Sequence, residues 1–109
     1  MNYKIKSIAP FDSQLKWLSK KYPSLKKEMA LLIESLSQEP KQGIDLGKNC
    51  YKIRLSVASK GKGKSGGARV ITLVRVVGET VYLLSIFDKS DQTSISESDL
   101  TQLLKRLPD

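Results

Sequence analysis

The spacing of apolar residues predicts one strand and two helices in the first 38 positions of the chain. Residues 3–8 alternate apolar and polar side chains, which is typical of a half-buried strand. A stripe with helical spacing follows at Phe11, Leu15, Leu18 and Tyr22. Asp12 or Ser13 is available to cap this helix, and Pro23 breaks it. A second stripe begins after Ser24, and the short link predicts an antiparallel helical hairpin.

The second half of the chain predicts three antiparallel strands and a final helix. After a loop at 38–48, strands are expected at 51–57, 68–77 and 81–87. In the first of them Lys52 and Arg54 share the face opposite to the apolar positions. The last helix begins at Ser96, where Asp99 occupies the position of a capping-box acid.

The expected order of elements is therefore β-α-α-β-β-β-α. Strands and helices that are segregated in this way predict an α+β fold, with helices packed on a curved antiparallel sheet. A length of 109 residues suits one domain, 1–109, with one hydrophobic core.

A glycine-rich basic segment lies between the first two strands of the predicted meander. Residues 60–69 read KGKGKSGGAR, and residues 46–78 contain eight basic residues and no acidic one. Such a local positive charge favours a polyanion such as nucleic acid. The alternative is a solvated cationic surface that only aids solubility.

The missing residue types exclude several kinds of chemistry. The chain has no histidine and a single cysteine, Cys50. Histidine-dependent nucleophiles, histidine-ligated metals and an internal disulfide are therefore excluded, and we expect neither a metal nor a cofactor. The chain also lacks a signal-peptide core and an apolar run near the ~20 residues of a membrane span. We therefore expect a cytoplasmic protein without a membrane partner.

One nucleotide-binding pattern is present only in part. Residues 58–65 fit a relaxed phosphate-loop pattern, with Ala58 in place of its first glycine. That loop needs a helix directly after Lys64 and Ser65, whereas two glycines and a strand are expected here. We therefore reject this interpretation.

Four cations of the sheet are candidates for a shared patch. Lys52 and Arg54 leave one strand on the same face, about 7 Å apart. Arg69 begins the next strand, and Lys89 follows the third. Antiparallel pairing would bring these four together, and the alternative is that they are scattered surface charges.

These residues carry a resemblance to a known family. The three motifs concerned are 51–54 (YKIR), 66–71 (GGARVI) after the glycine-lysine loop, and 83–91 (LLSIFDKSD). Together they resemble the RelE/HigB branch of the RelE/ParE toxin superfamily, over nearly the whole chain. The resemblance implies a RelE-like fold and a type II toxin that cuts mRNA in the ribosomal A site. It also implies a cognate antitoxin as partner.

The resemblance also assigns roles by position. It places active-site residues at Lys52, Arg54, Arg69 and Lys89. Contacts to RNA phosphates are expected from Lys48, Lys60, Lys62 and Lys64. Catalysis without histidine is feasible because the ribose 2′-OH is the nucleophile, and the protein aligns it, neutralises charge and moves protons.

Two features depart from the pattern or leave alternatives open. Relatives often carry a tyrosine near the C-terminus, but residues 90–109 contain no aromatic residue. Trp17 lies off the first helical stripe, and we assign it to the flank of the core, the alternative being a partner surface. The competing functions are a ParE-like inhibitor of DNA gyrase and a non-catalytic nucleic-acid-binding module.

Overall fold

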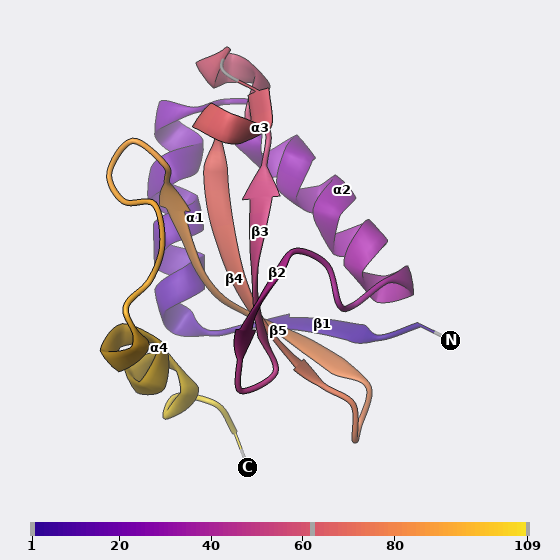
Figure 1. Ribbon diagram of the computed structural model, residues 1–109. Coiled ribbons are helices and arrows are strands. Elements are labelled where there is room, and N and C mark those ends of the chain that lie inside the picture. Colours follow the sequence, from indigo (N-terminus) through magenta and orange to yellow (C-terminus); the bar gives the residue numbers. More distant parts are fainter. Residues whose placement is uncertain (1, 62, 109) are drawn as a thin grey trace.

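The computed structural model describes residues 2–61 and 63–108 as a five-stranded sheet with helices on both faces (Figure 1). The strands are β1 (Lys4–Ser7), β2 (Ile44–Gly47), β3 (Cys50–Leu55), β4 (Ala68–Arg75) and β5 (Thr80–Asp88). The helices are α1 (Ala9–Lys21), α2 (Leu25–Gln38), the 3₁₀ turn η1 (Ala58–Lys60), α3 (Gly63–Gly66) and α4 (Glu97–Leu104). None of the described helices is long and apolar enough to cross a lipid bilayer.

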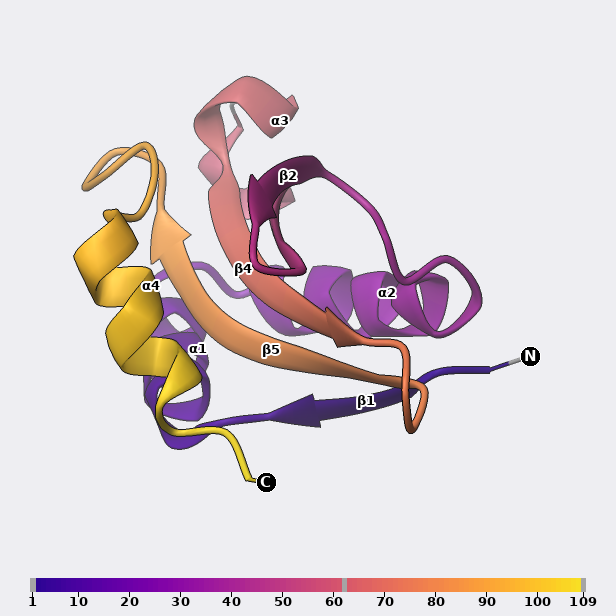
Figure 2. The same ribbon diagram turned by 60° about the horizontal axis from the view of Figure 1, so that its bottom comes forward.

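The strands lie in the order β1-β5-β4-β3-β2. The pairs from β2 to β5 are antiparallel, and β1 runs parallel to β5. The sheet is strongly curved, with α1 and α2 on one face and α4 at one end of the other (Figure 2). This curvature leaves the upper part of the second face, near the ends of β3 and β5, without a long helix over it (Figure 1).

Each face of the sheet has its own apolar cluster. Val70, Val74 and Ile86 pack under α1 and α2 with Phe11 and Met29. On the other face the cluster around Ile71, Leu73, Tyr82 and Leu84 is covered by Leu100 and other residues of the C-terminal helix. Because strand residues alternate between faces, the two clusters fix which side chains of β3 and β4 point away from α1 and α2.

The predicted α+β fold is confirmed, with differences in detail. The strand β2 replaces part of the expected 38–48 loop, and β1 makes the sheet mixed rather than purely antiparallel. The first helix begins at Ala9 without a side-chain cap, so the caps proposed at Asp12 or Ser13 were wrong. The cap of α4 is confirmed, because the Ser96 hydroxyl accepts the Asp99 N–H at 3.0 Å.

Trp17 was wrongly assigned to the core, because 66% of its surface is exposed. It lies off the buried stripe of α1, whose core-facing positions include Phe11 and Leu18. The large exposed ring therefore belongs to an outer surface of the molecule.

The turn η1 leads into the glycine-rich segment, and a second short helical turn, α3, lies within it. Lys64 and Ser65 fall within α3, a four-residue turn that leads into β4 rather than into a long helix. A helical turn was not expected in this loop. A turn of four residues does not restore the rejected phosphate-loop interpretation, because that loop needs a long helix after Lys64 and Ser65. Gly67 follows, and a Cβ atom there would lie 2.0 Å from the Leu55 carbonyl oxygen, so only glycine fits.

Candidate cationic site

Arg54 and Arg69 occupy directly opposite positions in the β3–β4 ladder. Side chains at such positions leave the sheet on the same face, with Cβ atoms about 5 Å apart. Their sequence neighbours Ile53 and Val70 lie in the cluster under α1 and α2, so both arginines point to the other face. Like charges at opposite positions disfavour strand pairing, and an arrangement that breaks such a rule is expected at a functional site.

Arg69 is a charged residue with only 4% of its surface exposed. Its guanidinium group donates a hydrogen bond of 3.0 Å to the Ala68 carbonyl oxygen. Burial and, in second place, the charge of Arg54 lower the pKa of Arg69. Because arginine remains protonated in proteins, Arg69 is a cation held in a fixed place beside the more exposed Arg54.

Lys52 lies on the same face, two residues before Arg54 and opposite Ile71. Its side chain is half-buried, and its ammonium nitrogen lies 3.4 Å from the carbonyl oxygen of Thr93. Thr93 belongs to the connection between β5 and α4, which therefore borders the cationic face. Lys52 adds a primary amine to the face that carries the two arginines.

Lys89 lies at the same end of the sheet. Its backbone N–H donates a 3.1 Å hydrogen bond to the Gly67 carbonyl oxygen, just before the start of β4. Its side chain is half-buried. The structure thus brings Lys52, Arg54 and Arg69 onto one face, with the backbone of Lys89 beside the first residues of β4.

Lys60 differs from the expectation that it binds RNA phosphate. Its ammonium group donates to Asp88 Oδ1 at 2.5 Å, to Ser90 Oγ at 3.1 Å and to the Gly67 carbonyl oxygen at 3.3 Å. Only 6% of its side chain is exposed. Three donors are the full capacity of an ammonium group, so Lys60 has an internal role.

Asp88, which the sequence analysis did not single out, is the centre of this network. It is 2% exposed and accepts hydrogen bonds from Lys60, from the Tyr22 hydroxyl at 2.5 Å and from the Ser90 N–H at 2.8 Å. Burial alone would raise the pKa of Asp88, but these hydrogen bonds outweigh it and hold the pKa well below its usual range. The only sequence signal was a buried-strand pattern that ends on an acid.

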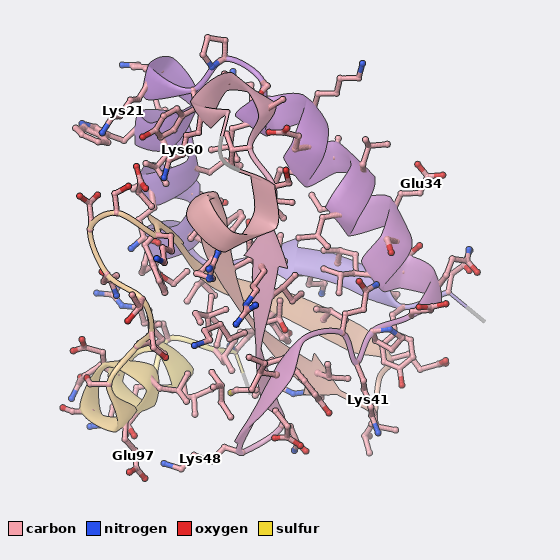
Figure 3. All side chains as sticks on the ribbon, turned by 45° about the horizontal axis from the view of Figure 1, so that its top comes forward. Lys21, Glu34, Lys41, Lys48, Lys60 and Glu97 are labelled. Carbon is pink, nitrogen blue, oxygen red and sulfur yellow. The ribbon has the colours of Figure 1, made fainter. Side chains whose placement is uncertain are left out.

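The remaining lysines fall into two groups. Lys48 lies at the opposite end of the sheet, where its ammonium group is 3.9 Å from Glu97 and 3.4 Å from Thr101 Oγ1 (Figure 3). It lies in the turn before β3, and the four strand positions from Cys50 to Arg54 alone span about 13 Å. Lys62 lies outside the described residues, and the side chain of Lys64 is not described.

The described residues contain no group of three or more metal-ligating side chains. The arrangement instead offers two guanidinium groups and the amine of Lys52 on one face of the sheet, with the backbone of Lys89 nearby. Guanidinium groups bind phosphate oxygens in a bidentate manner, and amines transfer protons. Such a site can bind a phosphodiester and stabilise extra negative charge on it.

The comparisons with known proteins bear on the family and the fold of the chain. A family model described as "RelE toxin of RelE / RelB toxin-antitoxin system" matches residues 14–107. Among solved structures, a variant of the E. coli toxin RelE in which two arginines are replaced by alanine, in the free state, aligns with a TM-score of 0.65 and 14% identity. That alignment covers 99% of this chain and 100% of the other.

Two further structures share the fold. The isolated E. coli RelE toxin aligns with a TM-score of 0.56 and 18% identity, over 96% of this chain and 99% of the other. The RelBE2 toxin–antitoxin complex from Mycobacterium tuberculosis gives 0.57 and 14%, over 81% of this chain and 99% of the other. Because the family model matches most of its length, this chain belongs to the RelE toxin family of RelE/RelB toxin–antitoxin systems.

Proposed function

We propose that this toxin is an endoribonuclease that cuts mRNA on the ribosome and so blocks translation. The observation that carries the proposal is the cross-strand pair of Arg54 and Arg69 on the face turned away from α1 and α2. The pair lies within residues 46–78, a stretch with eight basic residues and no acidic one. A phosphate group is the partner that such a pair of cations fits best.

The reaction follows from the side chains available. The ribose 2′-oxygen attacks the adjacent phosphorus, a proton leaves the 2′-OH, and the bond to the 5′-oxygen breaks as that oxygen takes up a proton. Arg54 and Arg69 stabilise the additional charge of the phosphorane. Lys52 and Lys89 are the proton carriers, because guanidinium groups stay protonated. Neither a metal nor a cofactor takes part in this scheme.

The proposal assigns alignment of the RNA to the ribosome. In-line attack requires the 2′-oxygen, the phosphorus and the leaving oxygen to be held in one geometry. The cationic face is part of an open sheet, so we infer that the A site holds the mRNA in place. Of the remaining lysines, Lys62 and Lys64 are proposed to contact RNA phosphates, and Lys48 to contact phosphates at the far end of the sheet.

The proposal includes a cognate antitoxin, as in the complex from M. tuberculosis. The surface proposed for it surrounds Trp17, which borders an open groove of about 370 Å³ between α1 and the segment after β5. Exposed tryptophans beside apolar grooves are frequent anchors of protein interfaces. Because Trp17 is the one tryptophan of the sequence, binding of the antitoxin there would change the tryptophan fluorescence of the toxin.

Expression of the chain without an antitoxin tests the function. The proposal predicts that protein synthesis stops before DNA synthesis, and that Arg54→Ala restores growth while Lys41→Ala, a substitution of an exposed lysine away from the site, does not. DNA breaks with translation intact would favour gyrase as target. Normal growth with salt-dependent RNA binding would favour a non-catalytic binding module.

A further inference from the structure

The buried carboxylate of Asp88 joins three parts of the chain that are distant in sequence. It is the last residue of β5, and it binds Lys60 of η1 and Tyr22 at the end of α1. The two partners also contact each other, since the Lys60 ammonium group lies 5.6 Å from the centre of the Tyr22 ring. We call these three residues the Asp88 clamp. In Figure 3, Lys60 lies at the end of α1, close to Lys21.

The turn η1 also forms hydrogen bonds with α2 and with the residue that precedes α2. Glu28 Oε2 accepts the Ala58 N–H at 2.6 Å, and the hydroxyl oxygens of Ser24 and Ser59 are 2.7 Å apart. The turn η1, which leads into the glycine-rich segment, is therefore bound to the helical layer. Among the side-chain hydrogen bonds of the described residues, only those of Lys60 join this turn to the end of β5 and to Gly67, just before β4.

The clamp reaches Arg69 through the backbone. Asp88 pairs with Ala68, the residue directly before Arg69. The carbonyl oxygen of Gly67 accepts hydrogen bonds from the Lys60 ammonium group and the Lys89 N–H. The clamp thus holds the start of β4 from two sides, at the point where the chain must direct Arg69 toward Arg54 against their mutual repulsion.

The charges of the clamp cancel within it. Asp88 leaves the sheet on the same face as its partner Ala68, toward α1 and α2, and without Lys60 its carboxylate would be a buried unpaired charge beside the start of β4. Paired with Lys60, it fixes the start of β4 without an uncompensated buried charge. A buried ion pair is weak as a source of stability but well suited to fixing one arrangement.

The geometry points to Asp88, Lys60 and Tyr22 as positioning residues that hold Arg69 in the geometry needed for the phosphorane. This inference rests on the proposed nuclease function. The three residues contact no substrate; they act through Gly67, Ala68 and the turn η1. A small displacement of Arg69 is expected to lower the rate of cleavage more than the binding of RNA, since misplacement by about 1 Å can cost about 100-fold in rate.

The test uses the double variant Asp88→Asn with Lys60→Met, which leaves no unpaired buried charge. Single-turnover cleavage of mRNA on translating ribosomes is measured against ribosome concentration. We expect the maximal rate to fall about tenfold or more while the half-saturating concentration stays within about twofold. Tyr22→Phe removes one hydrogen bond and is expected to give a smaller loss of the same kind. A double variant that cuts at the wild-type rate overturns the inference.

Amide hydrogen exchange supplies a readout that does not depend on cleavage. In the double variant the Lys89 amide, bound to Gly67, is expected to exchange about tenfold faster, with the Val81 amide unchanged. Unchanged exchange at Lys89, or equal acceleration at both amides, overturns the inference. If the wild type does not cut mRNA, the nuclease proposal fails, and the exchange pattern alone decides whether the clamp holds the start of β4.

Discussion

Arg54 lies directly opposite Arg69 across β3 and β4, and the more buried of the two, Arg69, has a pKa that burial and Arg54 lower. Two cations in this relationship weaken the pairing of the strands that carry them. The sheet tolerates them because β4 is buried along most of its length, so packing elsewhere compensates. Substituting one arginine of the pair therefore tests whether the pair serves function at a cost in folding stability.

Arg54→Thr is expected to make the protein slightly more stable and inactive. Removing one of two opposed charges relieves repulsion, and threonine suits a strand, so the free energy of unfolding should rise by about 0.5 kcal/mol. Urea unfolding measures the change, with Lys41→Thr as the control. A loss of more than about 1 kcal/mol would show that Arg54 stabilises the sheet.

The Asp88 clamp predicts a specific response to acid. The pKa of Asp88 lies below its ordinary value of 3.8 in the folded protein, so its contribution to stability is complete above about pH 5 and is lost as the pH falls below about 4. Between about pH 5 and pH 3 the free energy of unfolding of the wild type should therefore fall more steeply than that of Asp88→Asn. Parallel curves from urea unfolding at each pH would contradict the depressed pKa.

Gly67→Ala is expected to cost about 3 kcal/mol of unfolding free energy, because its Cβ atom would meet backbone at 2.0 Å. The matched control is Gly47→Ala, where a Cβ atom meets nothing within 4 Å and only the positive φ of 82° opposes the substitution. That control should cost about 1 kcal/mol. Equal losses in thermal or urea unfolding would show that close packing at Gly67 is not the cause.

Cys50 is expected to be unreactive in the folded protein. Burial, assisted by Asp45 and opposed by Lys48, raises the pKa of its thiol to about 11. Because the thiolate is the nucleophile, alkylation by iodoacetamide near about pH 8 should be slow until the protein is unfolded in urea. Rapid labelling of the native protein, at the rate found in urea, would contradict the buried position of Cys50.

Trp17 provides a test of the proposed antitoxin surface. Its emission should be typical of an exposed indole in the free toxin and should shift to shorter wavelength when the antitoxin binds. Trp17→Ala should weaken antitoxin binding by about 30-fold or more and leave mRNA cleavage unchanged. Binding without an emission change would place the antitoxin elsewhere on the toxin.

The elements that could be predicted from the sequence are those with a clear period. The stripe of α2 and the alternation of β3 each bury one face, and the Ser96 cap marks the start of α4. In contrast, β2 is only four residues long and mostly exposed, so it leaves no such pattern. The pairing of β1 with β5 joins segments more than 70 residues apart and has no local signal.

The candidate site was predictable in part for the same reason. Alternation placed Lys52 and Arg54 on one face, and strand order placed Arg69 beside them. A sequence does not show which lysine meets a buried acid, however, so Lys60 looked like its neighbours in the glycine-rich segment. Its partner Asp88 follows 28 positions later, and only the folded chain brings the two together.

The most direct test of the central claim is cleavage of mRNA by the purified toxin on translating ribosomes, with the new 5′ ends mapped by primer extension. We predict cuts at A-site codons with wild type and Lys41→Ala, and a loss of about 100-fold or more in rate with folded Arg54→Ala. Cleavage by Arg54→Ala at the wild-type rate, or no cleavage by a folded wild type, would contradict it.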